Sequence, residues 1–184
     1  MELNKEMKNK SKFLSLILRH KPENIGLILD KNGWAIVTEL LEKLKVYNNE
    51  LTFNELKFIV ENNDKKRFIF NDDFSKIRAN QGHSVDVDLE LENEQPPQYL
   101  YHGTAERNID SILKNGINSG NRQHVHLSNN IETATKVGMR HGKPVIFEIS
   151  SKEMFVNGIK FFKSENDVWL TDFVDSKFIK LKKS

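Results

Sequence analysis

Residues 85–98, with the sequence VDVDLELENEQPPQ, separate two longer blocks of the chain. Apolar and acidic residues alternate from Val85 to Glu92, and two prolines follow at positions 96 and 97. Alternation is typical of a strand, and a proline pair is typical of a junction. We therefore expect a short edge strand and then a domain boundary near residues 92–98. A solvated linker without a strand explains the same pattern equally well.

The charge of the chain is unevenly distributed around this acidic strip (residues 85–94). The net charge is only +2 over 184 residues, which excludes the strongly basic signature of a generic nucleic-acid binder. Residues 1–84 carry a balance of +3, residues 85–98 a balance of −5, and residues 99–184 a balance of +4. The two basic blocks leave room for a local basic site.

The composition points to a folded protein of one large or two small domains. Hydrophobic residues make up 38% of the chain and charged residues 29%, as in globular proteins. Cysteine is absent from the sequence, which excludes disulfides, thiolate zinc sites and cysteine nucleophiles. The charged N-terminus is followed by no long apolar run, so we expect no membrane span and a cytoplasmic location. We also expect a monomer, although no feature of the sequence specifies the oligomeric state.

The first block begins with a predicted helix. From Ser11 onward the apolar residues recur at helical spacing, and Pro22 predicts an end near Lys21. Arg19 and His20 fall in the last turn, where basic residues complement the helix dipole. That structural role explains both residues without any functional one.

Further signals in this block predict two more helices and a β-hairpin. Gly33–Val37 is predicted as a short strand. Thr38 is expected to cap a helix through Leu44, and Thr52 with Glu55 has the spacing of a capping box for a helix to about Val60. Residues 66–70 and 76–79 form the predicted hairpin. This order is typical of a winged-helix lobe, a fold that does not by itself give function.

The second block opens with a predicted strand at residues 99–102. Gly103 and Thr104 follow as an expected small-residue turn, and Glu106–Asn115 is an amphipathic helix that ends at Gly116. A strand, a turn and a helix in this order often present backbone N–H groups to phosphate. The His-Gly-Thr signal alone is weak.

Residues 122–128 carry a stronger signal. Strand periodicity places Arg122, His124, His126 and Ser128 on one face. These groups are costly to bury in an ordinary core, so they suggest a polar cleft that holds an anion or a sugar. Exposed strand residues are one alternative, and a metal site is another. No carboxylate or cysteine completes a ligand set, and we expect no metal.

The rest of the block adds a predicted helix near residues 131–141 and strands at residues 144–149, 159–162, 168–170 and 178–181. The whole chain is therefore predicted to be α+β.

Six segments together resemble the RNA 2′-phosphotransferase family, the enzymes related to the NAD-dependent tRNA-splicing 2′-phosphotransferase. In chain order they are residues 11–22, 64–68, 81–84, 101–104, 122–128 and 166–170. Each motif is weak alone, but the series covers nearly the whole chain.

The resemblance implies an N-terminal winged-helix lobe over residues 1–92 and an ADP-ribosyltransferase-like lobe over residues 93–184, with NAD+ bound in the cleft between. The catalytic group that it implies is Arg19, His20, Arg67 and Arg122. The cofactor-binding positions that it implies are His102, Gly103, Thr104, His126, Ser128 and Val168.

The implied reaction removes an internal 2′-phosphate from RNA and uses NAD+ as a co-substrate, without a metal. A phosphate oxygen displaces nicotinamide, which gives an ADP-ribosylated phosphate. The ribose 2″-hydroxyl then attacks phosphorus, which releases ADP-ribose 1″,2″-cyclic phosphate. Arginines suit such phosphoryl transfer because they bind two oxygens and stay charged. Alternatives are an ADP-ribosyltransferase that stops after the first step and a non-catalytic RNA-binding protein.

Overall fold

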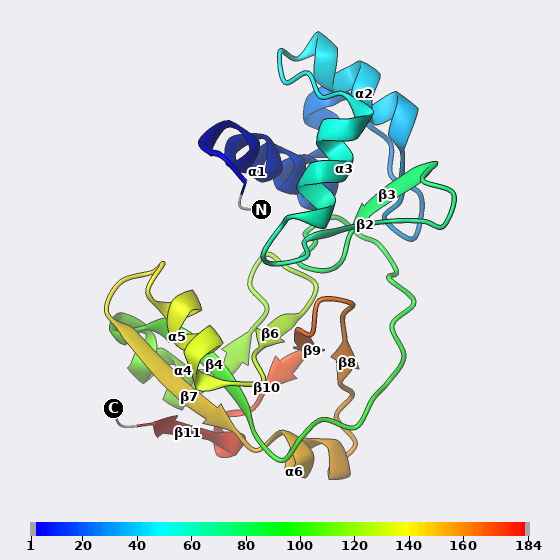
Figure 1. The fold of residues 1–184 in the computed structure, drawn as a ribbon. Coiled ribbons are helices and arrows are strands. Elements are labelled where there is room, and N and C mark those ends of the chain that lie inside the picture. The colour runs from blue at the N-terminus through cyan, green and yellow to red at the C-terminus, as the bar shows by residue number, and fades with distance from the viewer. Residues whose placement is uncertain (1–2, 183–184) are drawn as a thin grey trace. The chain divides into compact units, whose positions relative to one another are not determined.

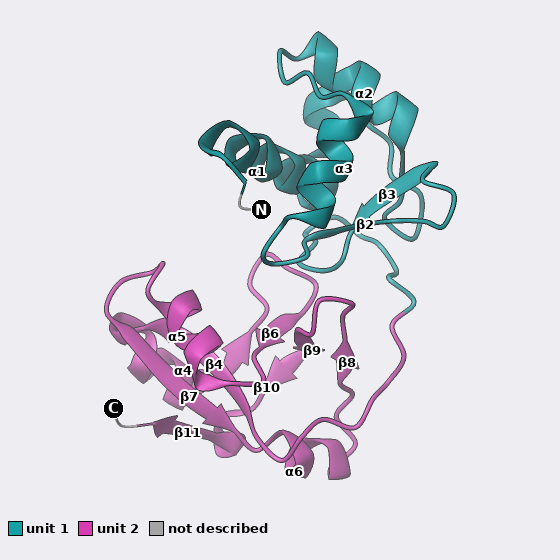
Figure 2. Ribbon diagram, viewed as in Figure 1, with its two compact units in different colours: residues 1–90 teal, residues 91–184 magenta. Residues whose placement is uncertain are grey.

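The computed structural model describes residues 3–182 and falls into two compact units, residues 1–90 and residues 91–184 (Figures 1 and 2). The division comes two residues before residue 92, where we expected the first lobe to end. Helices and antiparallel strands occur in both units. This mixture confirms the α+β class.

Unit 1 consists of helices packed on a small sheet. Its elements are α1 (Lys5–Arg19), η1 (Pro22–Ile25), β1 (Ala35–Ile36), α2 (Val37–Val46), α3 (Phe53–Glu61), β2 (Phe68–Phe70) and β3 (Lys76–Ala79). The sheet has the order β1-β3-β2, and both pairings are antiparallel. Leu14, Leu40, Leu56 and Ile77, from the three α-helices and β3, are fully buried in one core.

The start of α3 agrees with the sequence in detail. The Thr52 side chain accepts a hydrogen bond from the Glu55 N–H, and the Glu55 carboxylate accepts one from the Thr52 N–H at 2.8 Å. The predicted capping box is therefore confirmed. The predicted hairpin is also confirmed, because β2 pairs with β3.

Two predicted helix starts in unit 1 were wrong. Helix α1 begins at Lys5 rather than Ser11, with Asn4 as its cap; its polar first turns show no apolar periodicity. Helix α2 begins at Val37, so Thr38 is not its cap. The Val37 N–H bonds the Ser75 carbonyl at 2.9 Å, and a tertiary contact thus takes the place of a capping side chain.

The edge strand predicted in the acidic strip does not form. Residues 85–92, all described, have no strand pairing, although Val87 and Leu89 are buried and their neighbours are exposed. The Asp88 N–H bonds the Lys31 carbonyl at 2.8 Å, and the Asn32 side chain bonds the Asp88 carbonyl at 2.8 Å. The alternation of apolar and acidic residues is therefore explained by packing of an extended segment against the turn at residues 30–33.

Unit 2 is built mainly of short strands. Its elements are β4 (Leu100–Ala105), η2 (Glu106–Asn108), α4 (Ile109–Asn115), β5 (Ile117–Asn118), β6 (Val125–Leu127), α5 (Ile131–Gly138), β7 (Pro144–Ile149), α6 (Ser151–Val156), β8 (Phe162–Lys163), β9 (Trp169–Thr171), β10 (Phe173–Val174), η3 (Ser176–Phe178) and β11 (Ile179–Lys182). The sheet orders are β11-β7-β4, β6-β9-β8 and β10-β5. Phe147, Ile149, Met154 and Phe161 are fully buried in its core.

The turn expected at Gly103 and Thr104 is part of strand β4 instead. Both residues pair with β7, opposite Ile146 and Val145. A Cβ on Gly103 would lie 1.7 Å from the Ala134 carbonyl oxygen, because helix α5 crosses β4 at this point. The glycine is therefore explained by close helix–strand packing.

Within residues 3–182, no helix has both the length and the apolar character needed to cross a membrane.

Candidate functional site

Arg19 is the last residue of α1, and it is 9% exposed. Its Nη2 donates to the Arg67 carbonyl oxygen at 3.3 Å. Its own carbonyl accepts from the N–H groups of Ser84 and Val85, at 2.9 and 3.4 Å. A solvated cation near a helix end needs none of these contacts. The surrounding loops instead hold the Arg19 guanidinium beside Arg67.

Arg67 lies one residue before β2, and its side chain is held by the buried side-chain amide of Asn63. Its Nη1 donates to Asn63 Oδ1 at 3.0 Å, and the Asn63 amide donates to Ser11 Oγ at 2.9 Å. Asn63 and Ser11 are both buried. This chain of hydrogen bonds links the Arg67 guanidinium to the middle of α1.

The turn that leads into Arg67 has a strained backbone. Lys66 has φ 41°, a left-handed conformation that is unfavourable for a side chain with a Cβ. The Asn80 amide donates to the Lys66 carbonyl at 2.6 Å, and the Asn80 N–H donates to the Arg67 carbonyl at 2.9 Å. Such strain persists only where surrounding contacts hold it, and it is frequent at functional sites.

His20 directly follows Arg19 as the C-terminal cap of α1. Its Nδ1 lies 3.0 Å from Ser84 Oγ. Ser84 therefore helps to orient the imidazole through its hydroxyl, and the Ser84 N–H bonds the Arg19 carbonyl at the same time. The segment Gln81–Ser84 thus supports both neighbouring residues.

His83 is the most deeply buried titratable side chain of this cluster, at 1% exposure. Within the described chain, neither of its ring nitrogens has a hydrogen-bond partner. Burial lowers the pKa of His83 to about 4, and the positive charges of Arg19, His20 and Arg78 add to the effect. The ring is therefore neutral near pH 7.

Arg78 has a different environment from Arg19 and Arg67. Its guanidinium carbon lies 4.5 Å from the centre of the Trp34 ring, and its Nη1 donates to the Asn32 carbonyl at 3.4 Å. Stacking of this kind occupies the face of the guanidinium. We therefore assign Arg78 to the packing of β3 on the 30–34 turn.

In unit 2, paired backbones bring His102 and His126 together. Tyr101 and Ser128 exchange two backbone hydrogen bonds, at 2.9 and 2.8 Å, which join β4 to the end of β6. The His102 Nδ1 lies 3.4 Å from the His126 carbonyl oxygen. Because a carbonyl only accepts, Nδ1 carries the proton and Nε2 is left as an acceptor. Burial lowers the pKa of His102.

Arg122 lies before β6, outside the strand that we predicted for residues 122–128. Its Nη1 is 3.5 Å from His126 Nδ1. Partial burial lowers the pKa of Arg122, and the charge of Arg140 lowers it further. Buried Val125 and Leu127 alternate with half-buried His124, His126 and Ser128, which confirms the alternating faces for residues 124–128 but not for Arg122 and Gln123.

Two other predicted positions, Thr104 and Val168, lie on or beside these strands. Thr104 is buried, and its hydroxyl accepts from the Asn108 amide at 2.8 Å. Val168 ends the turn from Ser164, to which its N–H donates at 3.2 Å. It directly precedes Trp169, whose indole N–H donates to Asn129 at 2.7 Å.

His124 is explained by local contacts. Its Nε2 lies 3.8 Å from an Asp172 oxygen, and its ring packs against Phe162 with centroids 5.8 Å apart. Burial lowers the pKa of His124 although Asp172 acts in the opposite direction. Among the described residues, no group of three or more His, Asp or Glu side chains could hold a metal ion.

Comparison with known proteins places the chain in a family. Residues 5–173 match the model of the RNA 2′-phosphotransferase, Tpt1 / KptA family. The chain belongs to this RNA 2′-phosphotransferase family. A probable RNA 2′-phosphotransferase of Flavobacterium johnsoniae is 55% identical over 175 residues, which cover 95% of this chain and 96% of the relative.

Two further members give the same result. The probable RNA 2′-phosphotransferase of Fusobacterium nucleatum is 57% identical over 170 residues, 92% of this chain and 95% of that protein. That of Escherichia coli O9:H4 is 47% identical over 176 residues, 95% of this chain and 96% of that protein.

The implied catalytic group of the RNA 2′-phosphotransferase family is divided between the units. Arg19, His20 and Arg67 gather in unit 1, whereas Arg122 lies in unit 2 beside His126. The supporting roles of Asn63 and Asn80 and the burial of His83 beside them were missed. The sequence shows that His83 belongs to a family-like segment, residues 81–84, but only the structure shows that its side chain is buried in this cluster.

Proposed function

We propose that the chain is an NAD+-dependent RNA 2′-phosphotransferase that removes an internal 2′-phosphate of the tRNA splice-junction type. Family membership supports the RNA 2′-phosphate as the substrate. The observation that carries the proposal is the contact between Arg19 and Arg67. The Arg19 Nη2 donates to the Arg67 carbonyl oxygen at 3.3 Å, and His20 directly follows Arg19. Two guanidinium groups and an imidazole suit a phosphate dianion.

The arginines stabilise charge on the phosphate. A guanidinium offers paired donors that match two phosphate oxygens and stays protonated. Arg19 is nearly buried, and charge interactions strengthen where water is displaced. Arg67 is fixed by Asn63 at 3.0 Å, so little reorganisation is needed when the phosphate binds. Pre-oriented donors of this kind are a large part of phosphoryl-transfer catalysis.

His20 donates a proton to the departing 2′-oxygen of the RNA. When phosphorus leaves the 2′-oxygen of the RNA, that oxygen takes up a proton. An imidazole can donate a proton near neutral pH, and the contact with Ser84 at 3.0 Å fixes the ring plane. Ser84 is thereby a positioning residue in the proposal.

The polar face of unit 2 fits the groups of NAD+. His102 Nε2 is left as an acceptor for a ribose hydroxyl, and the Ser128 hydroxyl can donate to another oxygen of the cofactor. Arg122, whose Nη1 is 3.5 Å from His126 Nδ1, keeps the catalytic role at the phosphate that the family resemblance implies. Val168 adds an apolar surface beside Trp169. Bound NAD+ supplies an electrophilic ribose carbon and a nicotinamide leaving group. The phosphate already carries an anionic oxygen, so the chain needs no nucleophile of its own.

Both lobe assignments belong to this proposal. Three α-helices and the β2–β3 hairpin, with β1 added at the edge, support a winged-helix lobe in unit 1. The short antiparallel sheets with α4 and α5 support an ADP-ribosyltransferase-like lobe in unit 2.

The test is incubation with a 2′-phosphorylated oligoribonucleotide, with and without NAD+, followed by chromatography. We expect 2′-OH RNA, nicotinamide and ADP-ribose 1″,2″-cyclic phosphate only when NAD+ is present. Nicotinamide release with ADP-ribose retained on the RNA would favour an ADP-ribosyltransferase instead. Release of phosphate without NAD+ would contradict the proposal.

The same assay tests the expectation that no metal is needed. The arginines supply the charge that a cation would otherwise supply, so we expect full product formation in excess chelator. Loss of product that zinc or magnesium restores would contradict this part of the proposal.

A further inference from the structure

We propose that helix α1 carries a binding site for the RNA backbone beside the 2′-phosphate, formed by a basic row of Lys8, Lys12 and Arg19. The ligand class is the phosphodiester groups of the nucleotides that flank the modified one. This inference rests on the proposed function, because it uses Arg19 as the end of the row that meets the 2′-phosphate.

The helix geometry aligns the three side chains. At about 100° per residue, positions 8, 12 and 19 lie within about 40° of one another around the axis. Along the axis, Lys12 is about 6 Å from Lys8 and about 10 Å from Arg19. These intervals suit successive phosphates of an extended strand that leaves the site along α1.

A cavity lies beside the row. It has a volume of about 290 Å³, and its polar walls come from Lys8, Ser11, Lys12, Asn62, Asp64, Lys65 and Arg67. Four cations against one carboxylate make it complementary to phosphate. The cavity includes Arg67, so it is continuous with the group that we assign to the 2′-phosphate.

The wall of this cavity is rigid at the point where α1 meets the Arg67 turn. The buried Asn63 amide bonds Ser11 on α1 at 2.9 Å and Arg67 on the other side at 3.0 Å. The two walls are therefore held at a fixed separation by buried hydrogen bonds.

The opposite side of α1 has a different charge pattern. Lys10 forms ion pairs with Glu6 at 3.1 Å and Glu55 at 3.5 Å. Lys12 is exposed and has no ion-pair partner in the described part of the chain. Carboxylates therefore neutralise one side of the helix and leave a positive charge at the cavity. An anionic strand is the partner that this asymmetry fits.

The test compares two substrates with the double variant Lys8→Ala/Lys12→Ala. One substrate is an oligoribonucleotide with a central 2′-phosphate, and the other is a 2′-phosphorylated nucleoside without flanking phosphodiesters. The measured quantity is kcat/KM for the oligoribonucleotide divided by kcat/KM for the nucleoside. We expect the double variant to lower this ratio about tenfold by weakening binding of the longer one. For the oligoribonucleotide, the slope of log KM against log salt concentration should fall by about 1.4 in the double variant. This is the contribution of contacts with two single-strand phosphates, about 0.7 for each.

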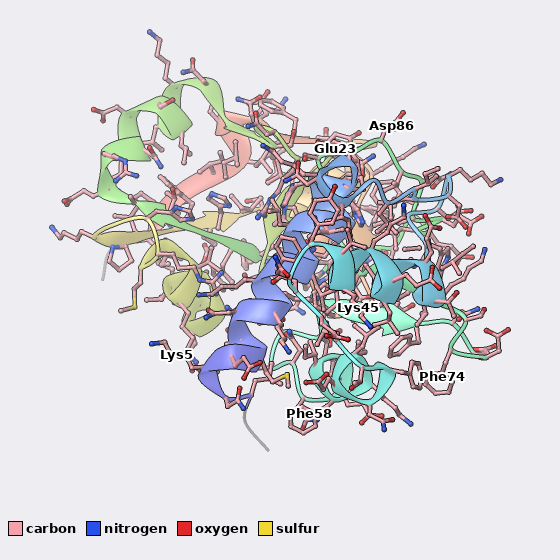
Figure 3. The ribbon with its side chains drawn as sticks, turned by 90° about the horizontal axis from the view of Figure 1, so that it is seen from above. Lys5, Glu23, Lys45, Phe58, Phe74 and Asp86 are labelled. Atoms are coloured by element: carbon pink, nitrogen blue, oxygen red, sulfur yellow. The ribbon has the colours of Figure 1, made fainter. Side chains whose placement is uncertain are left out.

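The control is Lys45→Ala, which also removes a lysine charge from unit 1. Lys45 lies on α2, and Lys5 marks the N-terminal end of α1 (Figure 3). We expect the ratio and the salt slope of Lys45→Ala to equal those of the wild type, and thermal unfolding to show that all variants are folded.

An unchanged ratio in the double variant would overturn the basic row as a binding site. Wild-type protein without turnover on either substrate would instead overturn the proposed function. In that case, fluorescence anisotropy with the same phosphorylated oligoribonucleotide tests the basic row independently of turnover. Equal affinity of the wild type and the double variant would overturn the row as a binding site. Weaker binding by the double variant would support it.

Discussion

The two units position their polar groups by different means. In unit 1, the buried side chains of Asn63 and Asn80, the exposed Ser84 and a strained turn hold Arg19, His20 and Arg67. In unit 2, strand pairing places His102 next to His126, and the Tyr101–Ser128 contact is made by the backbone. The arrangement of polar groups in unit 1 should therefore be sensitive to changes in the supporting side chains. In unit 2 the arrangement should be sensitive to changes that separate its strands and helix.

The largest expected effect is on the backbone packing of unit 2. Gly103→Ala would place a Cβ 1.7 Å from the Ala134 carbonyl oxygen, so β4 and α5 must move apart. We expect the free energy of unfolding to fall by more than about 3 kcal/mol, measured by urea denaturation.

Gly120→Ala is the matched control for this change. Gly120 has φ 63° and nothing within 4 Å of an added Cβ, so only the left-handed backbone is penalised, by about 1 kcal/mol. Equal losses in the two variants would contradict the close packing of α5 on β4.

The second effect is the pH dependence of stability caused by His83. Its pKa is about 4 in the folded protein, below the value of about 6.5 in an unfolded chain. The unfolded state therefore binds the proton more tightly. Stability is complete above pH 6.5 and declines as the pH falls towards 4, by up to about 3 kcal/mol for this group.

Urea denaturation of wild type and His83→Gln between pH 7 and pH 4 measures this contribution. The groups that face His83 are Arg19, His20 and Arg78, and they are present in both proteins. We expect a flatter pH profile in the variant. Parallel profiles would show that His83 does not titrate as described.

The third effect is on catalysis in unit 1. Arg19→Ala should slow removal of the 2′-phosphate by about 100-fold or more, the scale of losing a charge-stabilising donor. Arg78→Ala removes the same charge from a side chain that packs on Trp34, and we expect a much smaller loss. Turnover of folded Arg19→Ala at the wild-type rate would refute its catalytic role.

The smallest effect compares the two kinds of support directly. Asn63→Ala removes a buried amide that holds a guanidinium, and should lower the free energy of unfolding by about 2 kcal/mol. Ser128→Ala leaves the backbone contact with Tyr101 intact, and its free energy of unfolding should change by less than about 0.5 kcal/mol. The reverse order would contradict the two kinds of support that we describe within the units.

The features that the sequence predicted well depend on local chemistry. The capping box at Thr52 and Glu55 and the strand Pro144–Ile149 were both found, because propensity and packing agree there. The predicted edge strand failed because Val87 and Leu89 pack beside a turn that is distant in sequence. Gly103 was misplaced in a turn for the same reason, since its environment depends on α5.

The candidate site shows the same division. Its arginines and histidines came from motifs that resemble a family. The side chains that support them, such as Asn63 and Asn80, depend on tertiary contacts: the Asn63 amide bonds Ser11, which is 52 positions away. Asparagine is common in turns for local reasons, so the sequence offers no signal that these two side chains are buried at a site.

The most direct test of the central claim follows the phosphorus atom. An oligoribonucleotide with a radiolabelled internal 2′-phosphate is incubated with the protein and NAD+, and the labelled products are separated. We expect the label to leave the RNA in ADP-ribose 1″,2″-cyclic phosphate, with one nicotinamide released for each 2′-hydroxyl formed. Label in inorganic phosphate, or retained on the RNA after nicotinamide release, would contradict it.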